Sequence, residues 1–261
     1  MIKDPTTLTL SPSKVDTFLG CKRLFKYRYI NPPFTPAQNR YFLIGNIAHK
    51  ALETLHKEHM QNPIKNWNVA MGQHFKNAVK IYHVDRHIFS GILTQDDLFS
   101  IKKMLGNYLH YVKENVPRVR KVEQLKRIDV GGIVVWLKAD RIDSIKGGRY
   151  RVVDYKSGNV SPKKDERASV QIPSYGLLIK QHIDKDAIVE GAYLYLKFMG
   201  ANHGIRKYEI TEEWIADAVK RYHYVDSELK AGCYFTQNWY YKYCRICDFH
   251  EHCVEDQDNG V

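Results

Sequence analysis

The sequence predicts a mixed α/β fold, because the spacing of its apolar residues changes along the chain. Up to about residue 117 the apolar side chains recur at helical spacing. From Arg118, β-branched residues fill three runs separated by Gly-Gly pairs at 131–132 and 147–148, a pattern typical of antiparallel hairpins. A helical segment and another strand-like run follow, which is the order of a crossover connection. We therefore expect a central mixed β-sheet flanked by helices in a single domain over 1–261.

The N-terminal segments are predicted to be helical. Ser11 is a suitable N-cap residue and Pro12 suits the first helical position, so a helix is expected to begin here and to contain Cys21. A second helix is expected over about 42–59. Residues 60–117 also have helical patterns but no sharp motif, and we interpret them as a helical insertion within the domain.

The remaining segments alternate between predicted strands and helices. The run 149–158 precedes a helix expected over about 165–182, in which Pro173 fits only the first turn or a kink. Thr211 is a suitable cap for the last long helix. The other expected strands are 122–130, 133–145, 187–198 and 204–210.

The composition limits the class of protein. Lys and Arg number 40 against 29 Asp and Glu, a formal charge of +11, which favours a polyanionic partner such as nucleic acid or a membrane surface, although solubility alone also accounts for it. The chain has no run of about 18 apolar residues and no apolar run typical of a signal peptide, so we expect no membrane association and a cytoplasmic location. In that compartment five cysteines indicate metal binding or chemistry more than disulfides.

The sharpest chemical motif is the strand sequence RVVDYKSG. Side chains alternate along a strand, so Asp154 and Lys156 share one face. If the preceding hairpin strand pairs with this one, Asp140 or Asp143 lies near Asp154, and two adjacent carboxylates need a cation between them. Mg²⁺ binds such carboxylates together with phosphate oxygens, which predicts metal-assisted phosphodiester hydrolysis. The alternative is an ordinary surface ion pair between Asp154 and Lys156.

The helix sequence GNIAHKALE supplies further candidates. Gly45, His49 and Glu53 recur every four residues and lie on one stripe of the helix. His49 offers a neutral nitrogen ligand, whereas the alternative is a half-buried histidine beside the apolar face. Gly45 allows another backbone or a ligand to approach closely. His56 lies near the same stripe and is assigned no function.

The crossover helix adds an amide and a phenol. Gln171 and Tyr175 are four residues apart and share a face, from which they could hydrogen-bond a base or a phosphate near the metal. Three basic residues precede this helix and form either a nucleic-acid approach or a solvated loop: Lys163, Lys164 and Arg167.

The C-terminal segment YCRICDFHEHC is rich in metal ligands. Its three thiols are Cys244, Cys247 and Cys253, one short of a site with four thiolates. His250 or His252 could complete a zinc site of three thiolates and one imidazole.

The ordered set of these motifs resembles the PD-(D/E)XK nuclease superfamily in its RecB-like branch. Within that branch it is similar to the iron–sulfur nucleases, which include CRISPR-associated adaptation nucleases and AddB-type helicase–nuclease subunits. The resemblance spans about 11–253 and implies a restriction-endonuclease-like core.

The resemblance implies a role for each matching residue. Lys156 corresponds to the catalytic lysine, while Gln171 and Tyr175 correspond to a motif that supports the active site and the substrate strand. Glu53 and Asp143 match flanking positions, and we count Glu53 among the candidate catalytic residues. The implied metal ligands are His49, Asp140, Asp154 and the backbone carbonyl of Tyr155.

The resemblance also supplies a fourth thiolate. In these nucleases one cysteine of the first helix joins three C-terminal cysteines around a [4Fe–4S] cluster, and here that residue is Cys21. The cluster would join 1–30 and 233–261 into an iron–sulfur lobe. In the zinc alternative Cys21 is simply a buried apolar residue, and in both cases Cys233 is structural. The implied cluster ligands are Cys21, Cys244, Cys247 and Cys253.

The resulting interpretation is a deoxyribonuclease that depends on Mg²⁺ or Mn²⁺ and acts on single-stranded DNA or DNA ends, as an exonuclease. One alternative is a non-catalytic nucleic-acid-binding module with the same fold. Another is a nuclease subunit that is active only in a helicase or CRISPR adaptation complex. The sequence has no G-x-x-x-x-G-K-[ST] loop, so any motor would be a separate chain.

Overall fold

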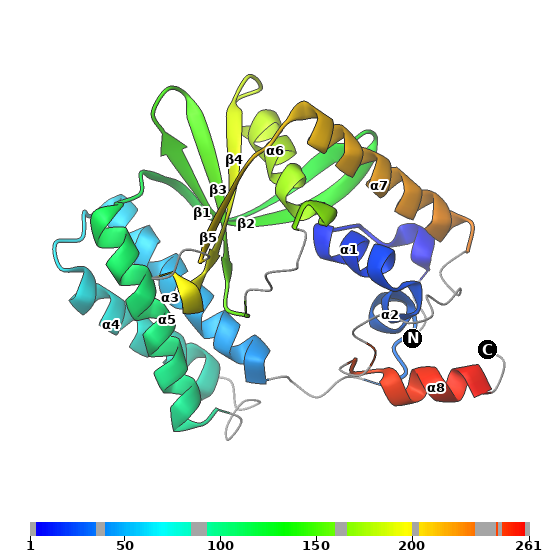
Figure 1. The fold of residues 1–261 in the computed structure, drawn as a ribbon, viewed down its shortest axis with the longest axis horizontal. Coiled ribbons are helices and arrows are strands. Elements are labelled where there is room, and N and C mark those ends of the chain that lie inside the picture. Colours follow the sequence, from blue (N-terminus) through cyan, green and yellow to red (C-terminus); the bar gives the residue numbers. More distant parts are fainter. Residues whose placement is uncertain are drawn as a thin grey trace.

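The computed structural model describes residues 4–34, 40–84, 93–159, 166–199, 204–232, 244 and 247–258. At its centre is a five-stranded sheet in the order β1-β2-β3-β4-β5, with helices on both faces (Figure 1). The predicted mixed α/β architecture is therefore confirmed. Among the helices of the described residues, none has the length and apolar character that crossing a bilayer requires.

The sheet combines an antiparallel meander with one parallel connection. β1, β2 and β3 pair antiparallel, and the tight turns between them place Gly131 and Gly147 at φ 62° and 75° in the left-handed region that glycine tolerates. β3 then pairs parallel with β4 through a crossover helix, and β5 pairs antiparallel with β4. The strands are β1 Val119–Val130, β2 Ile133–Ile145, β3 Arg149–Lys156, β4 Ile188–Tyr195 and β5 Ile205–Glu209.

One face of the sheet is covered by helices from both halves of the chain (Figure 1). Here Val152 of the sheet, Ile172 of the crossover helix and Tyr222 of the last long helix are buried in one apolar cluster. The Ser11 side chain caps the first helix and the Thr211 side chain caps the last, as their sequences predict. The helices are α1 Pro12–Gly20, α6 Gln171–His182 and α7 Glu212–Lys230, with a 3-10 turn Glu166–Ala168.

The other face is covered by consecutive helices that precede the sheet in the chain. Ile47, Tyr108 and Leu194 belong to a second apolar cluster between these helices and β3 and β4. The elements are α3 Arg40–Gln61, α4 Trp67–Val79, a π-helical turn Lys80–Val84 and α5 Gln95–Glu114. A 3-10 turn, Leu196–Phe198, ends β4 beside α5.

Segments from the two ends of the chain pack against each other beside this core (Figure 1). The Tyr27 and Phe249 rings lie 5.6 Å apart, and the Tyr27 hydroxyl donates to Asp256 at 2.5 Å. The Arg23 guanidinium donates to the carbonyl of Cys253 at 3.3 Å. The elements are a 3-10 turn Pro5–Thr7, α2 Lys22–Phe25, a π-helical turn Lys26–Ile30 and α8 His250–Asp258.

Two helix predictions are wrong in detail. Cys21 is not inside one helix: it has extended backbone (φ −158°) and ends α1 while its Sγ caps α2 by accepting from the Leu24 amide at 3.4 Å. The helix expected from about residue 165 begins at Gln171, because the Val170 amide donates to Asp16 at 3.0 Å. Pro173 therefore falls in the first turn, where its missing N–H costs nothing.

The feature that positions the site is a fork in the sheet. β2 and β3 pair from Arg141↔Val153 to Ile145↔Arg149. The first part of β2 then pairs with β1, while the end of β3 pairs with β4. If the register is continued by one residue, Asp140 lies opposite Asp154 where the two strands separate.

Candidate active site

Asp140 occupies the point at which β2 leaves β3. Because β2 no longer pairs there, the Tyr155 amide has no strand partner on that side and donates to Asp140 Oδ2 at 2.8 Å. His49 Nδ1 lies 3.4 Å from the same oxygen. The acid thus joins α3 to β3 at the fork.

In this pair each group favours the charged form of the other. Burial disfavours the protonated ring of His49, but the hydrogen bond and negative charge of Asp140 outweigh it and raise the pKa of His49. Burial likewise opposes ionisation of Asp140, but His49 and the Tyr155 amide keep the pKa of Asp140 lowered. A charged carboxylate and a nitrogen therefore face the same small space.

Gly45 explains why α3 comes so close to the end of β3. A Cβ at this position would lie 2.9 Å from Ser157 Oγ, so the serine hydroxyl would have to move aside for a larger side chain. The group that approaches Gly45 is thus a side chain, that of Ser157, and not the backbone or ligand that we expected. Glu53, two turns after Gly45, is ion-paired with Lys50 at 2.9 Å and Lys57 at 2.5 Å.

Asp154 and Lys156 project toward α6, as strand alternation predicts, and their ionic atoms are 2.6 Å apart. The Gln171 amide and the Tyr175 hydroxyl each donate to Asp154 Oδ1 at 2.8 Å. The Gln171 carbonyl in turn accepts from Lys156 at 3.2 Å. The Lys156 ammonium also lies 4.7 Å from the centre of the Tyr193 ring, a cation–π contact. Each of these groups therefore has its orientation fixed by a neighbour.

Glu123 of β1 is a site residue that the sequence reasoning missed. One ligand atom each of His49, Glu123 and Asp140 lie within 4.8 Å of one another. Glu123 has φ 50° and is ion-paired with Lys138. The signal was present in the sequence: a two-residue Gly-Gly turn fixes the hairpin register, and counting back from it places Glu123 opposite Asp140.

The donor set fits a divalent cation. It combines one imidazole nitrogen with carboxylate oxygens, which are ligands that Mg²⁺ and Mn²⁺ accept. Burial raises the pKa of Glu123, and the negative charges of Asp140 and Glu53 raise it further. A cation between these carboxylates would relieve that repulsion.

The comparison with protein families agrees with this geometry. Residues 9–254 match the model of the PD-(D/E)XK nuclease superfamily. The chain belongs to this superfamily.

One solved structure has the same fold. A protein described as a "putative exonuclease" from Eubacterium rectale is 13% identical, with a TM-score of 0.53, and the match covers 94% of this chain and 87% of that one. The structure of SSO0001 is 16% identical, with a TM-score of 0.33, and covers 79% of this chain and 82% of that one. Among curated proteins, none matches the sequence significantly.

Asp143 is the member of the predicted acidic group that this nuclease fold does not bring to the fork. It lies opposite Arg151 in the β2–β3 ladder, and its carboxylate is 2.8 Å from Arg141 Nε. The reason is position along the strand: Asp143 lies inside the paired β2–β3 ladder, three residues away from the fork, where Arg141 holds its carboxylate beside α5. Of the two acids considered as neighbours of Asp154, Asp140 holds that place.

Arg141 is the centre of a buried polar network behind the site. Its Nη1 donates to the hydroxyls of Tyr108 at 2.5 Å and Tyr155 at 2.7 Å, and lies 3.1 Å from His56 Nε2. Because a guanidinium can only donate, Nε2 accepts and the neutral His56 ring carries its proton on Nδ1. Burial, followed by the charge of Arg141, holds the pKa of His56 well below its usual value. Arg141 therefore fixes Tyr155, whose backbone contacts Asp140.

The predicted basic approach lies largely outside the described residues. Lys163, Lys164 and Cys233, which was expected to be structural, belong to segments that the structure does not describe. Arg167 is exposed in the 3-10 turn before α6. The nucleic-acid contacts of these basic residues stay predictions.

Cys21 interacts electrostatically with each of the other three cysteines expected to bind a cluster. Burial raises the pKa of Cys21, and the charges of Cys253 and Cys244 raise it further. The pKa of Cys247 is raised by burial and also by the charge of Cys21. Such mutual effects require thiols from both ends of the chain to be close in space.

Proposed function

We propose that this protein is a metal-dependent deoxyribonuclease that hydrolyses phosphodiester bonds, acting as an exonuclease on single-stranded DNA or DNA ends. The observation that carries the proposal is the convergence at one sheet fork of His49, Asp140 and the Asp154–Lys156 pair. Membership of the superfamily supports the reaction class.

The residues at the fork would hold the metal ion. His49 and Asp140 offer their side chains from α3 and β2, Asp154 adds a second carboxylate, and the Tyr155 carbonyl is the further predicted ligand. Glu123 is close enough to complete the set. Bound Mg²⁺ or Mn²⁺ would supply a water of lowered pKa and neutralise charge on the phosphate.

The protein's own groups provide the remaining chemistry. Gln171 and Tyr175 bind Asp154 Oδ1 and so direct its other oxygen toward Lys156. The ammonium of Lys156 is the donor best placed to orient a nucleophilic water and to stabilise negative charge on the phosphate. Asp140 is oriented by the Tyr155 amide. These contacts hold the reacting groups in position before substrate binds.

Exposed aromatic side chains support a single-stranded substrate. A cavity of about 520 Å³ is lined by Tyr41 of α3 and by Ser157 and Gly158, which follow the catalytic strand. Tyr41 is 64% exposed and its neighbour Phe42 is 72% exposed. Aromatic side chains of this kind stack on unpaired bases, each stack contributing about 1–3 kcal/mol.

The deciding experiment compares wild type with Lys156→Ala on labelled single-stranded and duplex DNA, with and without Mn²⁺. We expect metal-dependent degradation that falls by at least about a hundredfold in Lys156→Ala, since electrostatic stabilisation of the transition state is lost. Lys126→Ala, which removes an exposed lysine of β1, is the matched control and should cut normally. Binding without cutting in wild type would identify a non-catalytic module.

The substrate preference has its own test. Tyr41→Ala should weaken binding of a single-stranded oligonucleotide by about fivefold or more and leave duplex binding unchanged. Equal loss on both substrates would exclude base stacking as the source of the preference.

We also propose that Cys21, Cys244, Cys247 and Cys253 bind a [4Fe–4S] cluster, as in the iron–sulfur branch that the sequence resembles. The proposal is supported by the electrostatic interaction of Cys21 with the other three thiols, by the contact between the Tyr27 and Phe249 rings, and by the hydrogen bond from Arg23 to the Cys253 carbonyl. The cluster would close a loop of more than two hundred residues. By analogy with disulfides of that span, the crosslink would contribute about 4–5 kcal/mol to stability.

The cofactor is tested by anaerobic purification and metal analysis. A brown protein containing iron and sulfide, which loses both in Cys21→Ser, is expected. A colourless protein containing one zinc ion that survives Cys21→Ser would instead identify a zinc site of the three C-terminal cysteines and a histidine.

A further inference from the structure

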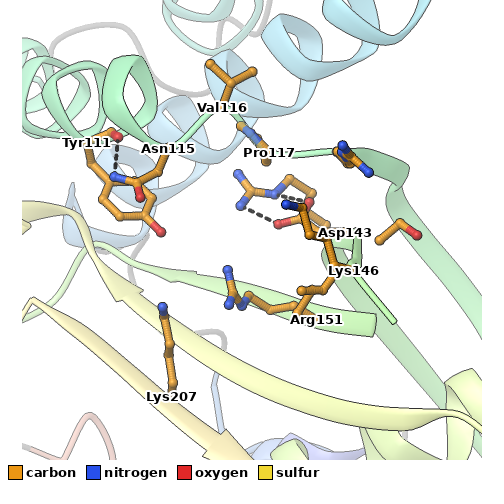
Figure 2. A pocket seen from close by; sticks show the side chains of 12 residues that line it. Tyr111, Asn115, Val116, Pro117, Asp143, Lys146, Arg151 and Lys207 are labelled. Carbon is orange, nitrogen blue, oxygen red and sulfur yellow. Dashed lines mark hydrogen bonds and ion pairs between the residues drawn. The ribbon is translucent and has the colours of Figure 1, made fainter. Parts of the chain in front are cut away.

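A second cavity lies on the α5 face of the sheet, away from the catalytic lysine. Its volume is about 320 Å³, and its walls come from the end of α5, the β2–β3 hairpin and β5. Figure 2 shows Arg151 and Lys207 pointing from two strands toward Tyr111 across the open space. The volume is sufficient for a small ligand such as a mononucleotide.

The charge of the lining is strongly positive. Five cationic side chains border the cavity against one carboxylate, that of Asp143. Within the described part of the chain, the side chains of Arg118, Lys146 and Lys207 make no hydrogen bond or ion pair. Arg151 is ion-paired with Glu190 of β4. At least three cations therefore face the cavity without a compensating acid.

The floor of the cavity is buried and already neutral. It is formed by the Arg141–Asp143 ion pair, whose members are only 2% and 3% exposed. Asp143 is thus committed to Arg141 and does not offset the cations above it. An anion entering the cavity would meet a surplus of positive charge and a nearby phenol, that of Tyr111.

The cavity is separate from the fork. Asp143 lies three residues from Asp140 along β2, about 10 Å at 3.3 Å per residue. Arg151 projects toward α5, whereas Lys156 projects toward α6. The buried Arg141 network fills the space between the two sites.

We propose that this cavity binds the phosphate group of a nucleotide or of a nucleic-acid strand. Three unpaired cations around a small concave space provide charge-assisted hydrogen bonds to phosphate oxygens, and Tyr111 offers a ring for the attached base. If the ligand is a nucleic-acid strand, the inference rests on the proposed nuclease function. The cavity would then hold a phosphate about three nucleotides along the strand from the metal site, at about 3.4 Å per nucleotide.

The first experiment measures binding of deoxyadenosine monophosphate by calorimetry without divalent metal, so that cleavage is not involved. The triple variant Arg118→Ala, Lys146→Ala, Lys207→Ala should bind it about tenfold more weakly or worse. Because these side chains are exposed and have no partners within the described residues, the variant should fold normally. Unchanged melting temperature checks this.

Two controls locate the binding site. The first control is a triple variant that removes the same charge from exposed positions outside the cavity: Lys65→Ala, Lys185→Ala, Lys220→Ala. It should leave nucleotide binding unchanged. Lys156→Ala should abolish cleavage but retain nucleotide binding. If the control triple weakens binding as much, or if Lys156→Ala removes it, the cavity is not the site and the inference is wrong. A failure of nuclease activity in wild type leaves this binding result intact.

The salt dependence of oligonucleotide binding identifies the source of the phosphate. A strand phosphate in the cavity predicts that the triple variant lowers the slope of log affinity against log salt by about 1 or more. An unchanged slope together with lost nucleotide binding identifies a free nucleotide as the ligand. Wild-type affinity in the triple variant for both probes would overturn the inference.

Discussion

Replacing Arg141 with methionine is expected to lower the free energy of unfolding by about 3–5 kcal/mol. The guanidinium is bonded to Asp143 by two contacts of 2.8 Å, and both residues are almost fully buried. Removing it would leave the buried Asp143 carboxylate either charged without a partner or forced to take up a proton. The hydroxyls of Tyr108 and Tyr155 would lose a donor as well.

The double variant Arg141→Met, Asp143→Leu separates the two sources of that loss. Since it also removes the uncompensated charge, we expect it to recover more than half of the stability lost in the single variant. The matched control is the exposed pair of Lys230 and Asp226 at 2.7 Å, where Lys230→Met should cost less than about 0.5 kcal/mol.

Urea denaturation followed by circular dichroism gives the free energies of unfolding for all four proteins. If Arg141→Met costs no more than the surface control, the ion pair is not desolvated and the reasoning about the network fails. If the double variant is less stable than Arg141→Met, the carboxylate contributes stability without its partner, which the structure does not allow.

Three further outcomes are expected. Burial, and then the charge of Arg141, lower the pKa of His56 in the fold, whereas in the unfolded chain the ring protonates near pH 6.5. The free energy of unfolding should therefore fall below pH 6.5, by up to about 1.4 kcal/mol per pH unit. His56→Phe should remove this pH dependence in urea denaturation curves. Glu123→Gln should weaken Mn²⁺ binding in calorimetry by about tenfold, whereas Lys138→Met should not weaken it. Gly191→Ala should lower the free energy of unfolding by about 1–3 kcal/mol, because its Cβ would lie 2.7 Å from Ile172 Cγ2; an unchanged urea midpoint would contradict this.

Much of the sheet follows from local patterns. The two Gly-Gly turns fix the hairpin register, and the period of two then places Asp154 and Lys156 together on the α6 face. The helix motif offered His49 as a possible nitrogen ligand, but its position beside Asp140 could not be worked out, because no local rule relates a helix stripe to a distant strand. The roles of these residues in catalysis stay predictions.

The residues that sequence reasoning misjudged share a physical cause. In the sequence analysis Arg141 had no role and Asp143 was a candidate neighbour of Asp154, and only tertiary packing shows that the two form a buried pair. Glu123 lies in a run of polar residues with no motif of its own. Cys21 interrupts a helix because its thiol caps the next one, a choice that helical periodicity does not reveal.

The left-handed backbone of Glu123 has a consequence for protein engineering. At φ 50° a residue with a Cβ costs about 1–2 kcal/mol relative to glycine. A screen for thermal tolerance should therefore favour Glu123→Gly, while a screen for turnover should reject it. Redesign of this chain for stability alone would therefore select a more stable but inactive variant unless position 123 is held fixed.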